Sequence, residues 1–171
     1  MLEEQLGLAQ KSSNLSWGPH ERPVDLVAAI GMASNTPHTK LGAEILRAFV
    51  GNDSFAYQDA VKLLARRIKA KNSHIPAVMR SKLAYRAMHE FLFPNCVKCT
   101  GTGVAMVEHK KTHCRACSGT GRHVFGDGER AKALGISKDE YRRIWEDRLG
   151  LALNIASSAY NSVIRGANKR R

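Results

Sequence analysis

The chain lacks any long apolar run, because no stretch of its 171 residues approaches the roughly 20 apolar residues that a membrane-spanning helix needs. It also lacks a recognisable signal peptide. These absences predict a soluble protein of the cytoplasm without a membrane partner. Outside its cysteines the sequence has no group of Asp, Glu and His at metal-ligand spacing, so we expect no enzymatic activity.

Acidic residues are scarce in this chain. Asp and Glu total 15 against 27 Lys and Arg, which gives a formal net charge of +12. Such an excess favours an anionic partner, and nucleic acid is favoured over a membrane surface. The alternative is a general charge that only keeps the protein soluble.

Cysteine is also rare, and all four cysteines fall in two copies of the motif CxxCxGxG, at residues 96–103 and 114–121. Four thiolates in two CxxC pairs suit one tetrahedral zinc ion. The glycines allow tight turns that offer backbone N–H groups to the sulfurs. The predicted zinc ligands are Cys96, Cys99, Cys114 and Cys117. Disulfide bonding is the alternative, and the missing signal peptide disfavours it.

A zinc ion held by four cysteines has no open coordination position, so we expect a structural role. Three nearby histidines, His109, His113 and His123, are alternative ligands or else exposed loop residues. A short basic run at 109–115 separates the two motifs and is predicted to form a solvated tip.

The rest of the chain has the periodicity of helices, which predicts a mainly α fold: a helical bundle with a helix-turn-helix-like unit that carries a small zinc-ribbon insertion. In the insertion, residues 104–107 and 122–125 are predicted to pair as strands. We expect a flexible N-terminal arm at 1–22, a helical body at 23–93, the insertion at 94–125, and C-terminal helices with a basic tail at 126–171. Within the body we expect helices from Pro23, at 40–50, at 55–71 and at 76–93, the last with core residues Val78, Met79, Leu83, Tyr85, Met88, Phe91 and Leu92.

Residues 130–144 have the pattern of a helix-turn-helix, with a turn glycine at Gly135 and a helix cap at Ser137. The second helix would expose cations able to reach base edges or phosphates in a major groove, namely Lys138, Arg142 and Arg143. Arg130 and Tyr141 depart from the usual pattern, and an ordinary helical hairpin is the alternative.

Several stretches together resemble the Q antitermination proteins of lambda-like phages, with coverage from Val24 to Arg122. They are residues 27–33, the helix at 59–71 with its basic end, the helix that leads to Cys96, and the doubled CxxCxGxG. The resemblance implies a factor that binds late-promoter DNA, engages paused bacterial RNA polymerase and promotes read-through of terminators. It would act as a monomer or as a pair assembled on DNA.

By the same resemblance, the zinc insertion would lie within the DNA-binding helical unit, with Lys110, Lys111 and Arg115 beside the DNA or the polymerase. Two other interpretations stay open. One is a zinc-containing, DNA-binding repressor or activator of transcription. The other is a chaperone-type CxxCxGxG module, although chaperones of that type carry more copies and a His-Pro-Asp signature that this chain lacks.

Overall fold

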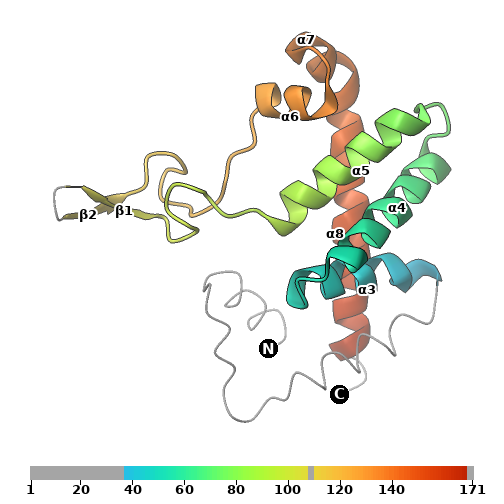
Figure 1. Ribbon diagram of the computed structural model, residues 1–171, viewed down its shortest axis with the longest axis horizontal. Coiled ribbons are helices and arrows are strands. Elements are labelled where there is room, and N and C mark those ends of the chain that lie inside the picture. The colour runs from blue at the N-terminus through green and yellow to red at the C-terminus, as the bar shows by residue number, and fades with distance from the viewer. Residues whose placement is uncertain (1–36, 108–109, 169–171) are drawn as a thin grey trace.

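The computed structural model describes residues 37–107 and 110–168 and is mainly helical, which confirms the predicted class (Figure 1). The expected N-terminal arm, the helix expected from Pro23, residues 27–33 and the end of the basic tail lie outside the described residues. None of the described helices has both the length and the apolar character needed to cross a membrane.

Three helices come first along the described chain, close to where the periodicity predicts them. They are α3 (Pro37–Val50), α4 (Ser54–Lys71) and α5 (Ala77–Leu92). Two short strands follow, β1 (Val104–Val107) and β2 (Lys110–His113). The chain then forms α6 (Asp127–Leu134), α7 (Lys138–Glu140), the π-helical turn η1 (Tyr141–Trp145) and the long helix α8 (Glu146–Asn168).

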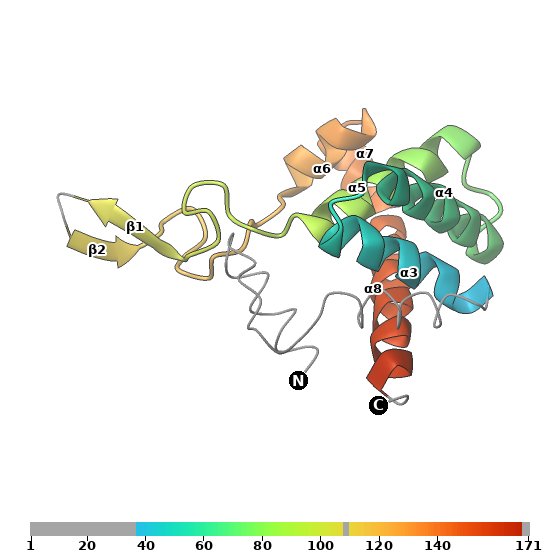
Figure 2. The ribbon, with the colours of Figure 1, turned by 60° about the horizontal axis from the view of Figure 1, so that its bottom comes forward.

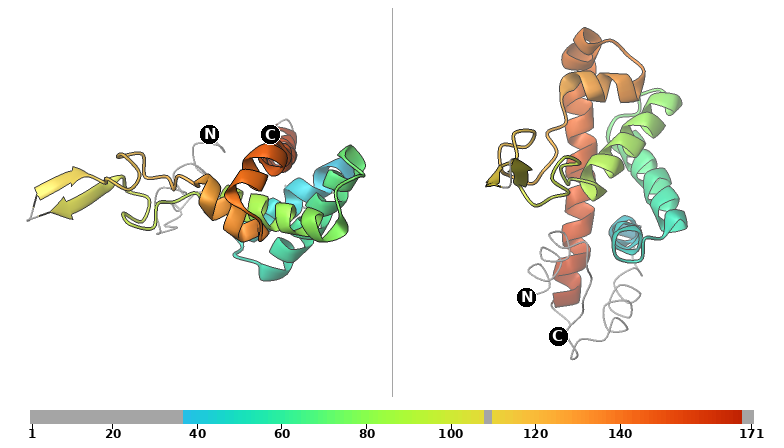
Figure 3. Two further views of the ribbon diagram at one scale, coloured as in Figure 1. Left: turned by 90° about the horizontal axis from the view of Figure 1, so that it is seen from above. Right: turned by 60° about the vertical axis from the view of Figure 1, so that its left-hand side comes forward.

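The helix α8 is the centre of the bundle, and α3, α4 and α5 all pack against it. Its full length is visible beside α3, α4 and α5 in the right-hand view of Figure 3. Alanine occupies many of its buried positions, so the neighbouring helices approach closely. The core contains Leu41 and Ile45 from α3, Leu64 and Ile68 from α4, Leu83 and Met88 from α5, and Leu149, Ala152, Ala156 and Ala159 from α8.

Local sequence explains where α4 begins and which side it buries. The Asp53 carboxylate accepts hydrogen bonds from the N–H groups of Phe55 and Ala56, at 2.9 and 3.0 Å, and so caps the helix. Buried residues then recur every four positions, at Ala56, Ala60, Leu64 and Ile68. This spacing places them in one stripe that faces the core.

In α5 the predicted core is partly wrong. Leu83, Met88 and Leu92 are buried as expected, but Val78 is 68% exposed and Tyr85 is 57% exposed. Positions 78 and 85 are seven apart and therefore share the outward face of the helix. The inward face contains two charged residues that the apolar pattern missed, Arg86 and Glu90.

A helical hairpin, formed by α6, the turn at Gly135, α7 and η1, follows the predicted helix boundaries. Gly135 has a left-handed backbone (φ 72°) and its N–H donates to the carbonyls at the end of α6. The Ser137 hydroxyl accepts from the N–H of Glu140 at 3.1 Å and caps the next helix. The backbone stays helical from Lys138 to Asn168, with one wider turn in which the Glu146 N–H donates to the Tyr141 carbonyl, five residues back.

α3 approaches α8 closely at Gly42. A Cβ atom at Gly42 would lie 2.2 Å from the carbonyl oxygen of Ala159. That oxygen belongs to a helix backbone and cannot move aside as a flexible side chain can. Gly42 therefore sets the distance between these two helices.

We expect Gly42→Ala to lower the free energy of unfolding by about 2 kcal/mol, because the added methyl group forces α3 away from α8. The matched control is Gly150→Ala in α8, where a Cβ atom would meet nothing within 4 Å. That change should stabilise the helix by up to about 1 kcal/mol. Urea denaturation of both variants measures the difference, and equal effects would contradict the close contact.

Candidate metal centre

The four cysteine sulfurs gather in one buried cluster. All four Sγ atoms lie within 4.8 Å of one another, and each cysteine is at most 6% exposed. Cys99 Sγ and Cys117 Sγ are 3.7 Å apart, close to the roughly 3.8 Å between sulfurs around a tetrahedral ion with 2.3 Å bonds. A disulfide would need about 2.05 Å, and the cysteines are free. The cluster can therefore hold a metal ion.

In each motif a backbone N–H donates a hydrogen bond to the sulfur of the second cysteine. The Gly103 N–H donates to Cys99 Sγ at 3.3 Å, and the Gly121 N–H donates to Cys117 Sγ at 3.3 Å. Both glycines have left-handed backbones, with φ of 74° and 72°. These bonds confirm the expected use of the glycines, which turn the chain so that its amides face the sulfurs.

The two motifs also form backbone hydrogen bonds to each other. The Cys96 N–H donates to the Gly121 carbonyl at 2.8 Å, and the Cys114 N–H donates to the Gly103 carbonyl at 2.8 Å. The halves are thus related by an approximate two-fold axis, and the end of each half bonds to the start of the other. Neither half can complete its hydrogen bonds alone.

The same two-fold relation decides the strand pairing, and it corrects one prediction. β1 pairs with β2, so that Val104 lies opposite His113, whereas residues 122–125 form no strand. Arg122 instead forms an isolated bridge with Asn95. The predicted pairing of 104–107 with 122–125 is wrong. The segment that follows each CxxCxGxG motif pairs instead with the segment that precedes the other motif.

Hydrogen bonding and burial set the acidity of the cysteines. Burial acts to raise the pKa of the Cys99 thiol, but the Gly103 N–H and the neighbouring cysteines outweigh it and lower that pKa to about 7. Burial raises the pKa of Cys114 to about 11. An ion that binds four thiolates must therefore displace protons, so its affinity should fall as the pH falls.

Two of the nearby histidines, His113 and His123, are not part of the cysteine cluster. The His113 ring lies against Gly119, where a Cβ atom would be 2.8 Å from His113 Nδ1. His123 Nε2 instead bonds to the Glu129 carboxylate at 2.9 Å. His109 is outside the described residues. The cysteines are thus the ligand set that the described residues offer.

A network of charged side chains, centred on the buried Arg86 and Glu90, joins α5 to α6, and the sequence patterns did not predict it. Glu90 accepts from Arg86 at 2.7 Å and from Arg130 through two bonds of 3.0 and 2.7 Å. Arg86 also donates to Glu129 at 2.9 Å. These bonds hold α5 against α6, and the hydrogen bonds to Glu90 raise the pKa of Arg130. The Glu90 bonds thus give Arg130 a partner between the two helices.

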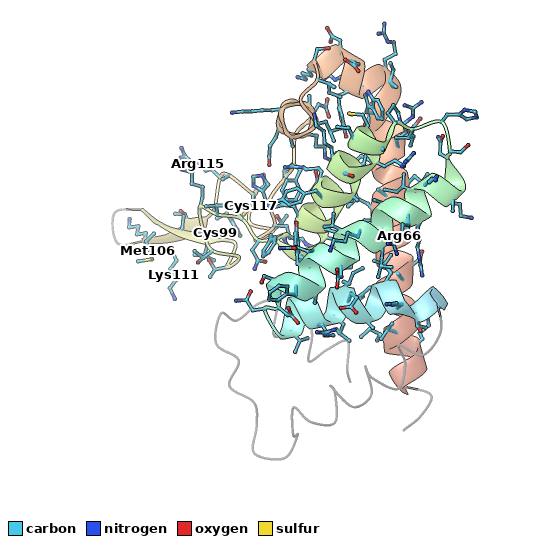
Figure 4. The ribbon with its side chains drawn as sticks, turned by 45° about the vertical axis from the view of Figure 1, so that its right-hand side comes forward. Arg66, Cys99, Met106, Lys111, Arg115 and Cys117 are labelled. Atoms are coloured by element: carbon cyan, nitrogen blue, oxygen red, sulfur yellow. The ribbon has the colours of Figure 1, made fainter. Side chains whose placement is uncertain are left out.

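The residues between Asn95 and Arg122, here called the four-cysteine module, extend to one side of the helices (Figure 2). Three of the predicted DNA-contact residues, Lys110, Lys111 and Arg115, are exposed on this module. In Figure 4, Lys111 and Arg115 point to opposite sides of it. The module therefore presents its cations around its surface and not on one face.

The other three predicted contact residues lie on the helical hairpin, away from the strands (Figures 1 and 2). Lys138, Arg142 and Arg143 are all exposed there. Arg142 Nε donates to the Asp127 carboxylate at 2.7 Å, and this bond is the main cause of the lowered pKa of Asp127. The six predicted residues thus form two separate groups.

We expect Gly103→Ala to weaken metal binding at least tenfold, because a Cβ atom there would lie 2.3 Å from the Gly119 carbonyl and would strain the turn that supports Cys99. The control is Gly150→Ala in α8, where a Cβ atom meets nothing within 4 Å. Competition against a chromophoric chelator measures both affinities. Equal affinities would show that the left-handed turn is not needed.

No protein-family model matches the chain, and no curated protein matches it.

Proposed function

We propose that the four cysteines bind one zinc ion in a structural role. Four thiolates in a closed, buried, tetrahedral arrangement are typical of structural zinc sites. When bound, the ion supplies the cross-link that holds both halves of the module together. The residues that hold it are Cys96, Cys99, Cys114 and Cys117.

We further propose that the protein is a phage transcription antitermination factor, which binds late-promoter DNA and engages paused RNA polymerase in the bacterial cytoplasm. The observation that carries this proposal is the separation of two exposed cationic groups, one on the four-cysteine module and one on the helical hairpin. A protein that holds DNA and polymerase together needs two surfaces. The net charge of +12 and the resemblance of residues 24–122 to the Q proteins support the same conclusion.

In this proposal the helical hairpin reads DNA as a helix-turn-helix. Its turn at Gly135 and its cap at Ser137 agree with that interpretation. Lys138 and Arg143 are exposed, and no ion pair within the described residues engages them. Arg142 would exchange its bond to Asp127 for a phosphate or a base edge.

We expect Arg143→Ala to weaken binding to the cognate promoter by about 1–3 kcal/mol if it contacts a base, and to leave the fold intact. Arg142→Ala should lose less, because its release from Asp127 offsets part of the contact. The matched control is Lys62→Ala, an exposed cation on α4 that pairs with Asp59 at 3.0 Å. Fluorescence anisotropy at several salt concentrations checks this, and unchanged affinity in both arginine variants removes the proposed reading helix.

The function itself is tested by single-round transcription with bacterial RNA polymerase holoenzyme. The template carries the phage late promoter beside this gene and a downstream intrinsic terminator. Read-through that requires both the protein and the promoter-proximal DNA supports antitermination. Specific promoter binding without any read-through would instead assign the protein as a zinc-containing repressor or activator.

A further inference from the structure

The first turn of α6 contacts both the chain that leaves the four-cysteine module, through Glu129, and Arg142 in η1, through Asp127. We propose that this turn couples the metal centre to the hairpin, so that metal binding controls the position of Arg142. This inference rests on the proposed binding of a metal ion by the four cysteines. It assigns a positioning role to Glu129 and Asp127, which the sequence motifs did not suggest.

The first step leads from the metal centre to residues 123–126, here called the neck. The neck starts where the module closes, at the bridge between Asn95 and Arg122. Next to it the Cys96 N–H donates to the Gly121 carbonyl, and the His123 N–H donates to the Pro94 carbonyl at 2.8 Å. These bonds need the second motif to be folded beside the first. Loss of the ion therefore frees the neck from residues 94–96.

The second step leads from the neck to α6. His123 Nε2 bonds to the Glu129 carboxylate at 2.9 Å, and the His123 and Phe125 rings pack edge to face, with centroids 4.5 Å apart. Arg86 lies over the Phe125 ring at 4.9 Å and also donates to Glu129 at 2.9 Å. Glu129 thus bridges the neck and α5, and without an ordered neck it keeps only its bond to Arg86.

The third step leads from α6 to the hairpin cations. Asp127 is two residues before Glu129, in the same turn, and its carboxylate accepts from Arg142 Nε at 2.7 Å. Arg130 keeps its own bonds to Glu90, but the start of the turn, with Asp127, loses the support of the neck and is held less firmly. Arg142 then loses its fixed position, although it lies far along the chain from the cysteines.

The end of α6 has independent support, so the effect should be local. Lys82 Nζ donates to the Leu134 carbonyl at 2.6 Å, and both Ala131 and Leu134 are buried. Neither contact involves the neck. Metal removal should therefore loosen the first turn of α6 and leave its last turn protected.

Hydrogen exchange by NMR on the full chain, with zinc and after chelation, tests the proposal. We expect the Arg130 amide, which donates to Gly126 in the first turn, to exchange at least tenfold faster after chelation. The Ile136 amide, which donates to Ala131, should change less than twofold. Equal Arg130 exchange in both states, with the zinc shown to be removed, overturns the coupling.

Coupling between sites is reciprocal, which gives a second test. Glu129→Ala should lower zinc affinity about fivefold, whereas Asp59→Ala, which removes an exposed acid of α4, should leave it unchanged. An unchanged affinity in Glu129→Ala overturns the proposal. If elemental analysis finds no zinc in the wild-type protein, the proposed metal site fails as well. The transcription assay tests the rest of the proposed function separately.

Discussion

Replacement of Cys99 by serine is expected to abolish zinc binding and to unfold the four-cysteine module. Cys99 is buried beside Cys117, and its sulfur accepts the Gly103 N–H. A serine hydroxyl is a poor zinc ligand, and structural zinc contributes on the order of 10 kcal/mol to the folding of such modules. Elemental analysis should show one zinc per wild-type chain and almost none in Cys99→Ser.

The control for this variant is Lys98→Ala, which changes an exposed residue between two cysteines. It should retain full zinc content. Limited proteolysis should cut Cys99→Ser within the module while α4, α5 and α8 stay protected, because the helices have their own core. A zinc content near one per chain in Cys99→Ser would contradict the assignment of this ligand. By the two-fold relation, Cys117→Ser should give the same result.

Removal of Glu90 is expected to be the most damaging single change within the helical bundle. The Glu90 side chain is 4% exposed and binds Arg86, which is 8% exposed, and Arg130. Glu90→Ala leaves a buried guanidinium without its main partner, and broken buried ion pairs of this kind cost about 3–5 kcal/mol. Urea denaturation followed by circular dichroism measures the loss.

An acidic residue on the surface serves as the control that distinguishes the effect of burial on stability from the effect of removing a charge. Asp59 pairs with Lys62 at 3.0 Å, but its side chain is 57% exposed. Asp59→Ala should therefore change stability by less than about 1 kcal/mol. Glu90→Gln keeps the size of the side chain and should recover part of the loss. If Glu90→Ala costs no more than Asp59→Ala, the network does not stabilise the fold.

The parts of the structure that depend on local sequence could be predicted. The helix boundaries at Asp53, Gly135 and Ser137 follow from caps and turns within a few residues. The cysteine cluster follows from spacing within each motif and from the absence of other cysteines. Apolar periodicity located α4 and α5, although it misplaced Val78 and Tyr85.

The parts that depend on contacts between distant residues could not be predicted. The predicted strand pairing is wrong because the segment after each motif pairs with the segment before the other motif. No local sequence pattern indicates this arrangement. Arg86 and Glu90 were missed because charged residues are normally assigned to the surface. The one available signal was their spacing of four residues on the apolar side of a helix, which permits an ion pair.

The π-helical turn η1 determines the direction in which the hairpin cations point. One additional residue in that turn rotates everything before it by about 100° about the helix axis, relative to an unbroken α-helix. Tyr141, Trp145 and Leu149, spaced four residues apart, are all buried against the core. Deletion of a single residue from η1 would keep the length of α8 but swing α7, with Lys138, around the axis. Insertion or deletion of one residue in η1 would thus change the direction of the cations that precede it without replacing any of them.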